Sequence, residues 1–353
     1  MKLLVTGAGG LIGFETVRFF LDKGAEVIGV DNNMRKYFFG EKGDTTANVK
    51  HLESISKHFK NMNIDIRNRD AIINLFKKEG PFDLVVHTAA QPSHDWAARE
   101  PFTDFDINAV GTLNLLEAFR LHSPEGVFIF TSTNKVYGDA PNRVELVELE
   151  KRYEYADKQT MLGVSDKGIS EEMTIDNSTH SIFGASKAAA DVMAQEYGRY
   201  FNLNVGVFRG GCLTGPQHSA VELHGFLTYI VDCAVNKKPY TLFGYKGKQV
   251  RDQIHSKDVV NAFWEFYKNP KQGVAYNLGG GKQNSASIIE VIDIMDKEFG
   301  LKLNYTYSKV NRVGDHICYY SDLSKLKKDY PNWDITISIK DMIKEIIDQK
   351  KQE

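Results

Sequence analysis

Three glycines near the start of the chain have the spacing of a phosphate-binding loop. Gly7, Gly10 and Gly13 follow the apolar residues 3–5 and precede an amphipathic stretch. In a strand–turn–helix unit, the first glycine permits a tight turn, the second lets the backbone approach a pyrophosphate, and the third lets helix and strand pack closely. The helix N-terminus offers N–H groups and a positive dipole end to the phosphates. The sequence therefore predicts a dinucleotide site whose contacts include four residues of this loop: Gly7, Gly10, Leu11 and Ile12.

Asp31 follows the next apolar run, residues 26–30, where a carboxylate can bind the hydroxyl groups of an adenosine ribose. Because a carboxylate repels a 2′-phosphate, Asp31 favours NAD over NADP, and its neighbour Asn32 is expected to line the same site. Arg35 and Lys36 come shortly afterwards and leave NADP open as the alternative. NAD is the predicted cofactor.

Two further strand ends are expected on the same edge of the sheet. Asp65 and Ile66 are expected to end the third strand, where a carboxylate and its neighbour can cap the adenine. The fourth strand is expected to end at His87, which we interpret as a structural histidine. The small residues after it would let the dinucleotide pass over the sheet: Thr88, Ala89 and Ala90.

Apolar runs of strand length alternate with amphipathic stretches of helical length through the first half of the chain. The runs are expected to be buried parallel strands, at residues 3–5, 26–30, 84–87 and 127–131. Helices are expected between them, at residues 14–23, 69–78 and 108–121. Such alternation predicts an α/β fold, a Rossmann-type doubly wound parallel sheet with helices on both faces.

The pattern loosens into shorter pieces after about residue 209, which predicts a smaller C-terminal substrate-binding lobe interleaved with the sheet. We therefore assign residues 1–208 to the cofactor-binding domain and residues 209–353 mainly to the second lobe. Residues 140–179 are polar and charged, with little periodic signal. A loop of this length in a compact domain is usually functional or mobile, so we interpret it as a substrate-side insertion.

Composition excludes several classes of function. The 353 residues carry a formal net charge of −2, so no basic surplus indicates a nucleic-acid partner. No apolar stretch is long enough to predict a membrane span. The three cysteines are scattered, without the spacing of a metal site or a disulfide framework: Cys212, Cys233 and Cys318. A reducing cytoplasm is the expected location.

Three further stretches carry a family resemblance. They are residues 108–112 (NAVGT), residues 132–139 (STNKVYGD) and the expected helix that contains Lys187. Together with the glycine loop and Asp31, they resemble extended short-chain dehydrogenases/reductases of the NAD-dependent nucleotide-sugar epimerase and dehydratase group. The similarity covers essentially the whole chain. Within the group, residues 132–139 and 247–252 look most like the 2-epimerases of CDP-paratose and CDP-tyvelose.

The resemblance implies catalytic roles for a hydroxyl, a tyrosine and a lysine. Thr133 is similar to the residue that bonds the sugar oxygen being oxidised, and Lys187 to the residue that holds the nicotinamide ribose and lowers the pKa of the tyrosine. The tyrosine would stand one helical turn before Lys187, but that position is Phe183. A phenyl ring can neither donate nor accept a proton.

Three interpretations of Phe183 stay open. In the first, the chain is a working epimerase whose acid/base is another residue: His180, Tyr137, the pair His94 and Asp95, or Thr133 as a relay. In the second, phenylalanine replaces a natural tyrosine in order to trap a bound substrate. In the third, the protein binds a nucleotide sugar without turning it over.

The resemblance also implies a substrate site. Arginines suit the diphosphate because their planar guanidinium groups bind phosphate oxygens in pairs. The predicted substrate-binding residues are Gln91, His94, Thr133, Asn134, Arg209, Arg251 and Arg312.

The expected reaction is a transient oxidation of a nucleotide-diphosphate sugar to a ketosugar, followed by reduction on the opposite face. The subfamily resemblance implies C2 of a CDP-hexose, with C4 of a UDP-sugar as the nearest alternative. A 4,6-dehydratase is less favoured, because Asn134 and Lys135 stand where an acid–base pair is needed. A net oxidoreductase, which would consume NAD(P)H in stoichiometric amounts, is a further alternative. A homodimer is expected from the resemblance alone, and no metal, nucleic acid or membrane is expected as a partner.

Overall fold

A computed structural model describes residues 1–216, 225–310 and 315–351. The chain forms two compact units. The first unit comprises Met1–Val136, Ser181–Arg209 and Val259–Tyr276, and the second comprises Tyr137–His180, Gly210–Asp258 and Asn277–Glu353. The predicted boundary at residue 208 lies beside one of the crossings. Each unit is assembled from three separate segments of the chain.

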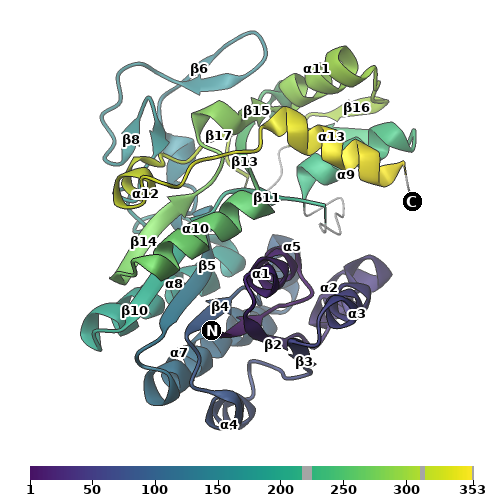
Figure 1. Ribbon diagram of the computed structural model, residues 1–353. Coiled ribbons are helices and arrows are strands. Elements are labelled where there is room, and N and C mark those ends of the chain that lie inside the picture. Colours follow the sequence, from purple (N-terminus) through teal and green to yellow (C-terminus); the bar gives the residue numbers. More distant parts are fainter. Residues whose placement is uncertain (217–224, 311–314, 352–353) are drawn as a thin grey trace. The chain divides into compact units, whose positions relative to one another are not determined.

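A seven-stranded sheet forms the centre of the first unit (Figure 1). Its order is β14 (Gln272–Leu278), β10 (Asn204–Gly210), β5 (Val127–Thr133), β4 (Leu84–His87), β1 (Lys2–Thr6), β2 (Glu26–Val30) and β3 (Phe59–Met62). The pairs from β5 to β3 are parallel. Strand order reverses direction between β1 and β4, with Thr6 opposite His87, and ligands of such sheets bind at the carboxyl ends of the strands beside this reversal. The predicted doubly wound sheet is confirmed.

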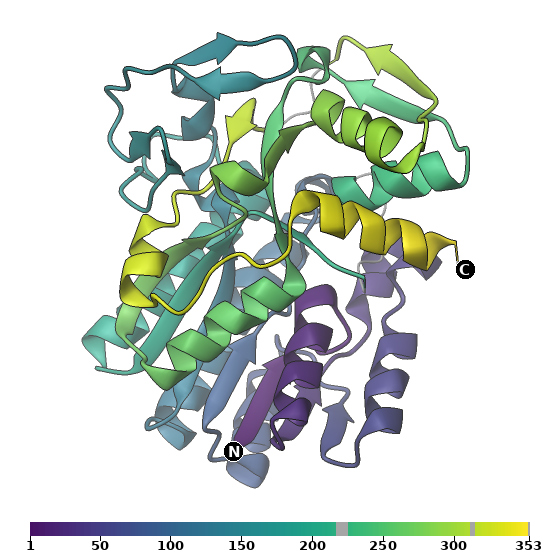
Figure 2. The ribbon, with the colours of Figure 1, turned by 45° about the horizontal axis from the view of Figure 1, so that its top comes forward.

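Helices cover both faces of this sheet because each presents an apolar side to it. Figure 2 shows α1 (Leu11–Asp22) and α10 (Ser256–Lys268) side by side in front of the sheet. Trp264 of α10 packs edge-on against Phe19 and Phe20 of α1. The other helices of the unit are α2 (Met34–Phe39), α3 (Thr46–Ile55), α4 (Arg69–Glu79), α5 (His94–Arg99), α6 (Pro101–Phe105), α7 (Gly111–His122) and α8 (Ser181–Tyr200). Its main core lies between sheet and helices and includes Leu4, Ile28, Leu115 and Phe128.

The second unit is built from smaller pieces. Strand β13 (Val250–His255) pairs with β11 (Cys212–Thr214), β15 (Ser285–Ser287) and β17 (Cys318–Tyr319), and β12 (Tyr240–Phe243) pairs with β16 (Tyr305–Ser308). Its core is formed largely by α9 (Phe226–Val235), α11 (Ile288–Phe299) and α13 (Ile339–Lys350), which lie together in Figure 1. Ser287 and Ser338 each form a capping box that begins α11 and α13. Helix α12 (Ser324–Asp329) completes the unit.

The polar segment 140–179 is not structureless. It forms two hairpins, β6 (Leu146–Glu148) with β7 (Tyr153–Tyr155) and β8 (Val164–Ser165) with β9 (Gly168–Ile169). Strands of two or three residues are too short to produce an alternating apolar pattern, so the sequence pattern did not reveal them.

Two other findings bear on the composition. Across the described ranges 1–216, 225–310 and 315–351, no helix is long and apolar enough to cross a membrane. Within the same ranges, no cluster of His, Cys, Asp and Glu is arranged to hold a metal ion. None of the three cysteines forms a disulfide bond.

Candidate functional site

The glycine loop lies between β1 and α1, as predicted. Gly7 has φ +70°, and a Cβ there would lie 2.8 Å from the backbone nitrogen of Ala89. A Cβ on Gly13 would lie 2.0 Å from the carbonyl oxygen of Gly7. Helix and turn are therefore in direct backbone contact. No side chain caps α1 at Gly10, so its N-terminal N–H groups suit a bound pyrophosphate.

Asp31 connects this loop to the end of β2. Its Oδ2 accepts a hydrogen bond of 2.9 Å from the N–H of Gly9, and its Oδ1 accepts one of 2.8 Å from the N–H of Asn33. Thr45 Oγ1 donates a third, at 3.1 Å. These bonds hold the carboxylate beside the glycine loop, where it can accept ribose hydroxyls. The loop and Asp31 together fit an NAD dinucleotide.

Arg35 and Lys36, the two basic residues that follow Asp31 in the sequence, contact other side chains. The guanidinium of Arg35 lies over the Phe39 ring, 4.7 Å from its centroid, and burial lowers its pKa against an opposing effect of Asp31. Lys36 pairs with Glu41 and Asp44, each at 3.0 Å. These contacts favour NAD over the alternative NADP.

Asp65 and Ile66 lie in the loop after β3, because that strand ends at Met62 and not at Asp65 as expected. Asp65 forms an ion pair of 2.6 Å with Arg67. Ile66 is buried, and its side chain lies 2.7 Å from the point where a Cβ on Gly111 would stand. Their contact with adenine stays a prediction.

His87 is the centre of a buried hydrogen-bond chain. The N–H of Ala89 donates to Thr6 Oγ1, whose hydroxyl lies 2.7 Å from His87 Nδ1. On the other side, His87 Nε2 lies 2.9 Å from Thr112 Oγ1, and that hydroxyl donates to the carbonyl of Asn108. A neutral imidazole with its proton on Nε2 satisfies every group in this chain. Burial, assisted by the charge of Lys187, lowers the pKa of His87 to about 3, so the ring is structural.

Beyond His87, Thr88 Oγ1 donates to the carbonyl of Thr6 at 2.7 Å. Ala89 and Ala90 are partly exposed beside it. The residues predicted to lie under the dinucleotide are thus small or turned toward β1. Their contact with the cofactor stays a prediction.

Lys187 of α8 bonds β5 two residues before Thr133, the last residue of that strand. The ammonium of Lys187 donates to the carbonyl of Thr131 at 2.8 Å and lies over the Phe130 ring. Burial lowers the pKa of Lys187 to about 7, although Asp191 and Asp104 oppose the shift. Two residues further along the strand, Thr133 Oγ1 accepts a hydrogen bond of 3.2 Å from the N–H of Lys135.

Thr133 is half-buried and Asn134 buried. The hydroxyl of Thr133 donates a long hydrogen bond of 3.5 Å to Asn134 Oδ1, so a ligand oxygen would compete with this neighbour for its proton.

Phe183 lies near the start of α8, directly against His94. The two rings are 5.0 Å apart between centroids and inclined at 67°. His94 Nδ1 lies 2.9 Å from Ser181 Oγ, and the N–H of Gly184 donates to the same oxygen at 3.2 Å. Ser181 has φ +59°, a region that residues other than glycine rarely adopt. Helices α5 and α8 thus place an imidazole beside the ring of Phe183, the position at which the resemblance implied a phenol.

Two other acid/base candidates, Tyr137 and His180, have partners within the second unit. The hydroxyl of Tyr137 is fully buried and bonds Asn277 Oδ1 at 2.8 Å. His180 Nδ1 donates to the carbonyl of Ser178 at 2.9 Å. Asp95 is exposed in the first turn of α5.

Two predicted substrate residues, Gln91 and Arg209, are buried in internal networks. Gln91 Nε2 donates to Asp104 Oδ1 at 2.7 Å, and its Oε1 accepts from the N–H of Ser93. The guanidinium of Arg209 binds Asp191 through two hydrogen bonds of 3.0 and 2.9 Å. In this structure both side chains bond other residues of the first unit. Their contact with substrate stays a prediction.

Asp191 was not anticipated from the sequence. It is fully buried and also accepts a hydrogen bond of 2.6 Å from Ser132, the residue before Thr133. It therefore fastens α8 to β5 and β10. Its position four residues after Lys187, on the same face of the helix, was the available signal.

The second unit carries Arg251, one of the two predicted phosphate-binding arginines. Arg251, on β13, donates to the carbonyl of Val250 at 2.8 Å and lies 3.6 Å from Asp315. Asp252 beside it is buried and accepts the N–H of Ser321 at 2.9 Å, which fixes this part of the strand. Arg312 lies outside the described residues.

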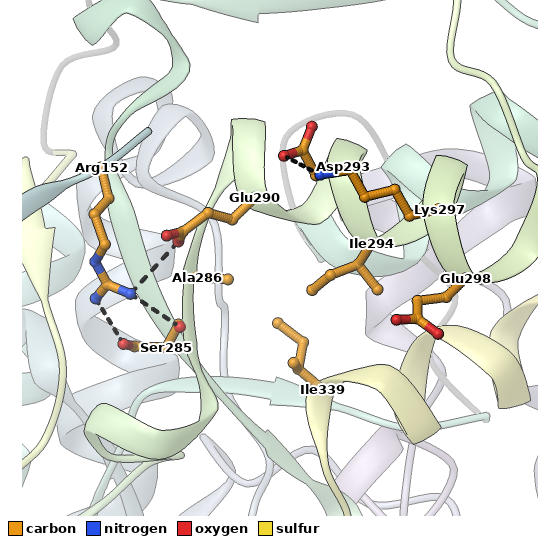
Figure 3. Close-up of a pocket in the computed structure, with 9 residues that line it drawn as sticks. All are labelled: Arg152, Ser285, Ala286, Glu290, Asp293, Ile294, Lys297, Glu298 and Ile339. Atoms are coloured by element: carbon orange, nitrogen blue, oxygen red, sulfur yellow. Dashed lines mark hydrogen bonds and ion pairs between the residues drawn. The ribbon is translucent and has the colours of Figure 1, made fainter. Parts of the chain in front are cut away.

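A pocket of about 350 Å³ lies elsewhere in the second unit (Figure 3). Ile294 and Ile339 contribute apolar side chains to its lining. Arg152 also lines the pocket and donates a hydrogen bond of 2.9 Å to Ser285 Oγ. Asp293 is paired with Lys297. None of the predicted site residues lines this pocket, which is braced by ion pairs of the unit itself.

Comparisons with known proteins agree with this geometry. The model of the NAD dependent epimerase/dehydratase family matches residues 3–279. A CDP-paratose 2-epimerase from Salmonella typhi is 33% identical, over 99% of this chain and 98% of that protein. A UDP-glucuronate 4-epimerase from Thermodesulfobacterium geofontis is 28% identical, over 99% and 96%.

Solved structures of nucleotide-sugar epimerases have a similar fold. A UDP-glucuronic acid 4-epimerase from Bacillus cereus, a tyrosine-to-phenylalanine mutant in complex with NAD and a fluorinated UDP-sugar, superposes with a TM-score of 0.79. It is 25% identical, and the match covers 100% of this chain and 99% of that one. A UDP-glucose 4-epimerase from Bifidobacterium longum, in complex with NAD⁺ and UDP, is also 25% identical, with a TM-score of 0.78 and the same coverage.

Proposed function

Because the chain belongs to the NAD dependent epimerase/dehydratase family, we propose that it epimerises a nucleotide-diphosphate sugar at C2 of a CDP-linked hexose. The observation that carries this choice is the 33% identity with a CDP-paratose 2-epimerase over essentially the full length of both chains. The presence of Thr133 at the end of β5 and of Lys187 on α8, bonded to that strand, supports an enzyme over a protein that only binds.

In this proposal, the glycine loop and Asp31 hold NAD, and Lys187 binds its nicotinamide ribose. When bound, NAD takes a hydride from the sugar carbon and later returns it. Thr133 donates a hydrogen bond to the oxygen on that carbon, which strengthens as the oxygen becomes a carbonyl. Arg251 binds the diphosphate as a guanidinium fork.

The test is incubation of the purified protein with CDP-paratose and trace NAD in deuterated water, followed by NMR. We expect the C2 epimer to form without deuterium at C2, because the hydrogen removed as hydride is the one returned. Net accumulation of NADH, or deuterium at C2, would contradict this mechanism.

A second candidate is C4 epimerisation of a UDP-sugar, supported by the 28% identity with a UDP-glucuronate 4-epimerase. Parallel incubations with UDP-glucose and UDP-glucuronate test it. A chain that binds these sugars and converts none would instead be the non-catalytic homologue that Phe183 allows.

We also propose a homodimer located in the cytoplasm. Helix α8 exposes Ile182, Val192 and Met193, and α6 exposes Phe102 and Phe105. Such apolar side chains suit an interface with a second copy. The lack of a disulfide bond among the three cysteines fits a reducing compartment. Light scattering of the purified protein tests the dimer, and a monomer at micromolar concentration would contradict it.

A further inference from the structure

Phe183 leaves the proposed reaction without its usual proton carrier, and the side chain against it is an imidazole. His94 is the first residue of α5 and Phe183 the third of α8. Their edge-to-face contact, with centroids 5.0 Å apart, places a ring that can carry a proton beside one that cannot.

Ser181 fixes the orientation of this imidazole. Its oxygen accepts the N–H of Gly184 as α8 begins, and its second lone pair can accept the Nδ1–H of His94, 2.9 Å away. The neutral imidazole then carries its proton on Nδ1, which leaves the lone pair of Nε2 to take up a proton. A base oriented by a third group is the usual arrangement in acid–base catalysis.

The backbone of Ser181 supports the same conclusion. Its φ of +59° is a strained conformation for a residue with a side chain. Strain of this kind persists where the surrounding structure enforces it, and it concentrates at functional sites. Here it directs the Ser181 hydroxyl toward His94.

The neighbouring residues complete the arrangement. Lys187 lies one helical turn after Phe183 on α8 and binds the strand that ends at Thr133. His94 therefore belongs to the same unit as both, whereas Tyr137 and His180 belong to the other unit and bond Asn277 and Ser178 there.

Building on the proposed function, we propose that His94 is the catalytic acid/base of this chain. The C–H bond of the sugar carbon breaks with its electron pair leaving as hydride to NAD⁺. The hydroxyl O–H bond breaks with its proton going to the imidazole, and a carbonyl forms. Return of the hydride to the opposite face, with return of the proton from the imidazolium to oxygen, restores both partners with no net oxidation.

Substitution His94→Gln tests the assignment through turnover of CDP-paratose by the NAD-loaded protein. We expect a fall in kcat of about 10²–10⁴-fold with KM nearly unchanged, the range that general acid–base catalysis supplies. Phe183→Tyr in the His94→Gln background should restore at least part of this loss, because a phenol would again stand before Lys187. His58→Gln, at an exposed histidine, is the matched control. Turnover that survives His94→Gln would overturn the proposal.

NMR of the imidazole nitrogens gives a readout that does not require turnover. The His94 signals, assigned by their loss in His94→Gln, should shift when CDP-paratose saturates the NAD-loaded protein, while those of His58 should not. If no nucleotide sugar is converted, the proposed function fails, but a shift still supports contact between His94 and the sugar. An unshifted His94 signal at saturation would overturn that contact.

Discussion

Two regions of the first unit differ in how their polar groups find hydrogen-bond partners. One is the sheet edge that carries Asp31 and His87, here called the cofactor edge, and the other is the beginning of α8. At the cofactor edge, Asp31 bonds backbone N–H groups of Gly9 and Asn33, and His87 is held neutral in a closed chain. At the beginning of α8, a strained Ser181 and the pair His94 and Phe183 come from separate elements.

This difference shows which part of a site can change. Binding a dinucleotide depends on backbone geometry, since Gly7 and Gly13 leave no room for a Cβ. Moving a proton depends only on some titratable side chain reaching the right oxygen. A chain can therefore keep its hydride chemistry while drawing its acid/base from another helix.

The largest expected effect on stability breaks the anchor between α8 and the sheet. Asp191→Ala leaves the buried Arg209 guanidinium without its carboxylate, and loss of one partner of a buried ion pair typically costs about 3–5 kcal/mol. Urea denaturation should show this loss. Asp296→Ala, at an exposed aspartate of α11, is the control and should change stability by less than about 0.5 kcal/mol. A similar loss in both variants would contradict the argument.

Lys187→Met separates chemistry from stability. Turnover should fall by about 10²–10³-fold, the usual cost of removing one electrostatic donor from a site. The pKa of Lys187 is lowered from 10.5 to about 7 in the folded protein, so the unfolded chain binds more protons between these values. The stability of the cofactor-free protein should therefore rise from pH 7 toward pH 10.5 because of this group, and the variant should lose that rise.

Denaturation of the wild-type and Lys187→Met proteins at several pH values gives this difference directly. Lys50→Met, at an exposed lysine of α3, should leave it unchanged. If stability changes with pH as steeply in Lys187→Met as in the wild-type protein, the ammonium of Lys187 is not the group that causes the rise.

Phe183→Tyr alone sharpens the comparison. If His94 already carries the proton, turnover should change by less than about threefold, which corresponds to under 1 kcal/mol in the barrier. A rise of several orders of magnitude in steady-state assays would instead identify phenylalanine as a replacement for a working tyrosine.

A separate effect of acid on stability is expected at His87. Burial lowers the pKa of His87 from 6.5 to about 3, so the unfolded chain takes up a proton that the folded protein excludes. Stability should fall as the pH drops from 6.5 toward 3, by at most about 1.4 kcal/mol per pH unit. His87→Gln should flatten this part of the curve relative to His58→Gln. An equally steep curve would contradict the neutral assignment.

The sequence predicted the parts of the fold that depend on local pattern. The runs ending at Val30 and His87 became β2 and β4, because a strand buried on both faces is uniformly apolar. The end of β3 was placed too late, since Phe59–Met62 is mixed in polarity.

For the site, the sequence could indicate the glycine loop and Asp31, because residues close together along the chain define them. It could not indicate the partners of Gln91, Arg209 and His94, because each depends on residues up to 87 positions apart along the chain. Only the folded arrangement shows that an imidazole from α5 lies against the ring of Phe183.

The contact of Trp264 with α1 has a consequence for how the protein is made. Residues 259–276 supply α10 and most of β14, the outermost strand beside β10. During synthesis on the ribosome, the first unit must therefore wait for three quarters of the chain, with the edge of β10 unpaired until then. Such long-range pairing slows folding and exposes a strand edge to aggregation. Nascent chains that stop before residue 259 should depend on chaperones, whereas chains that extend past residue 278 should not.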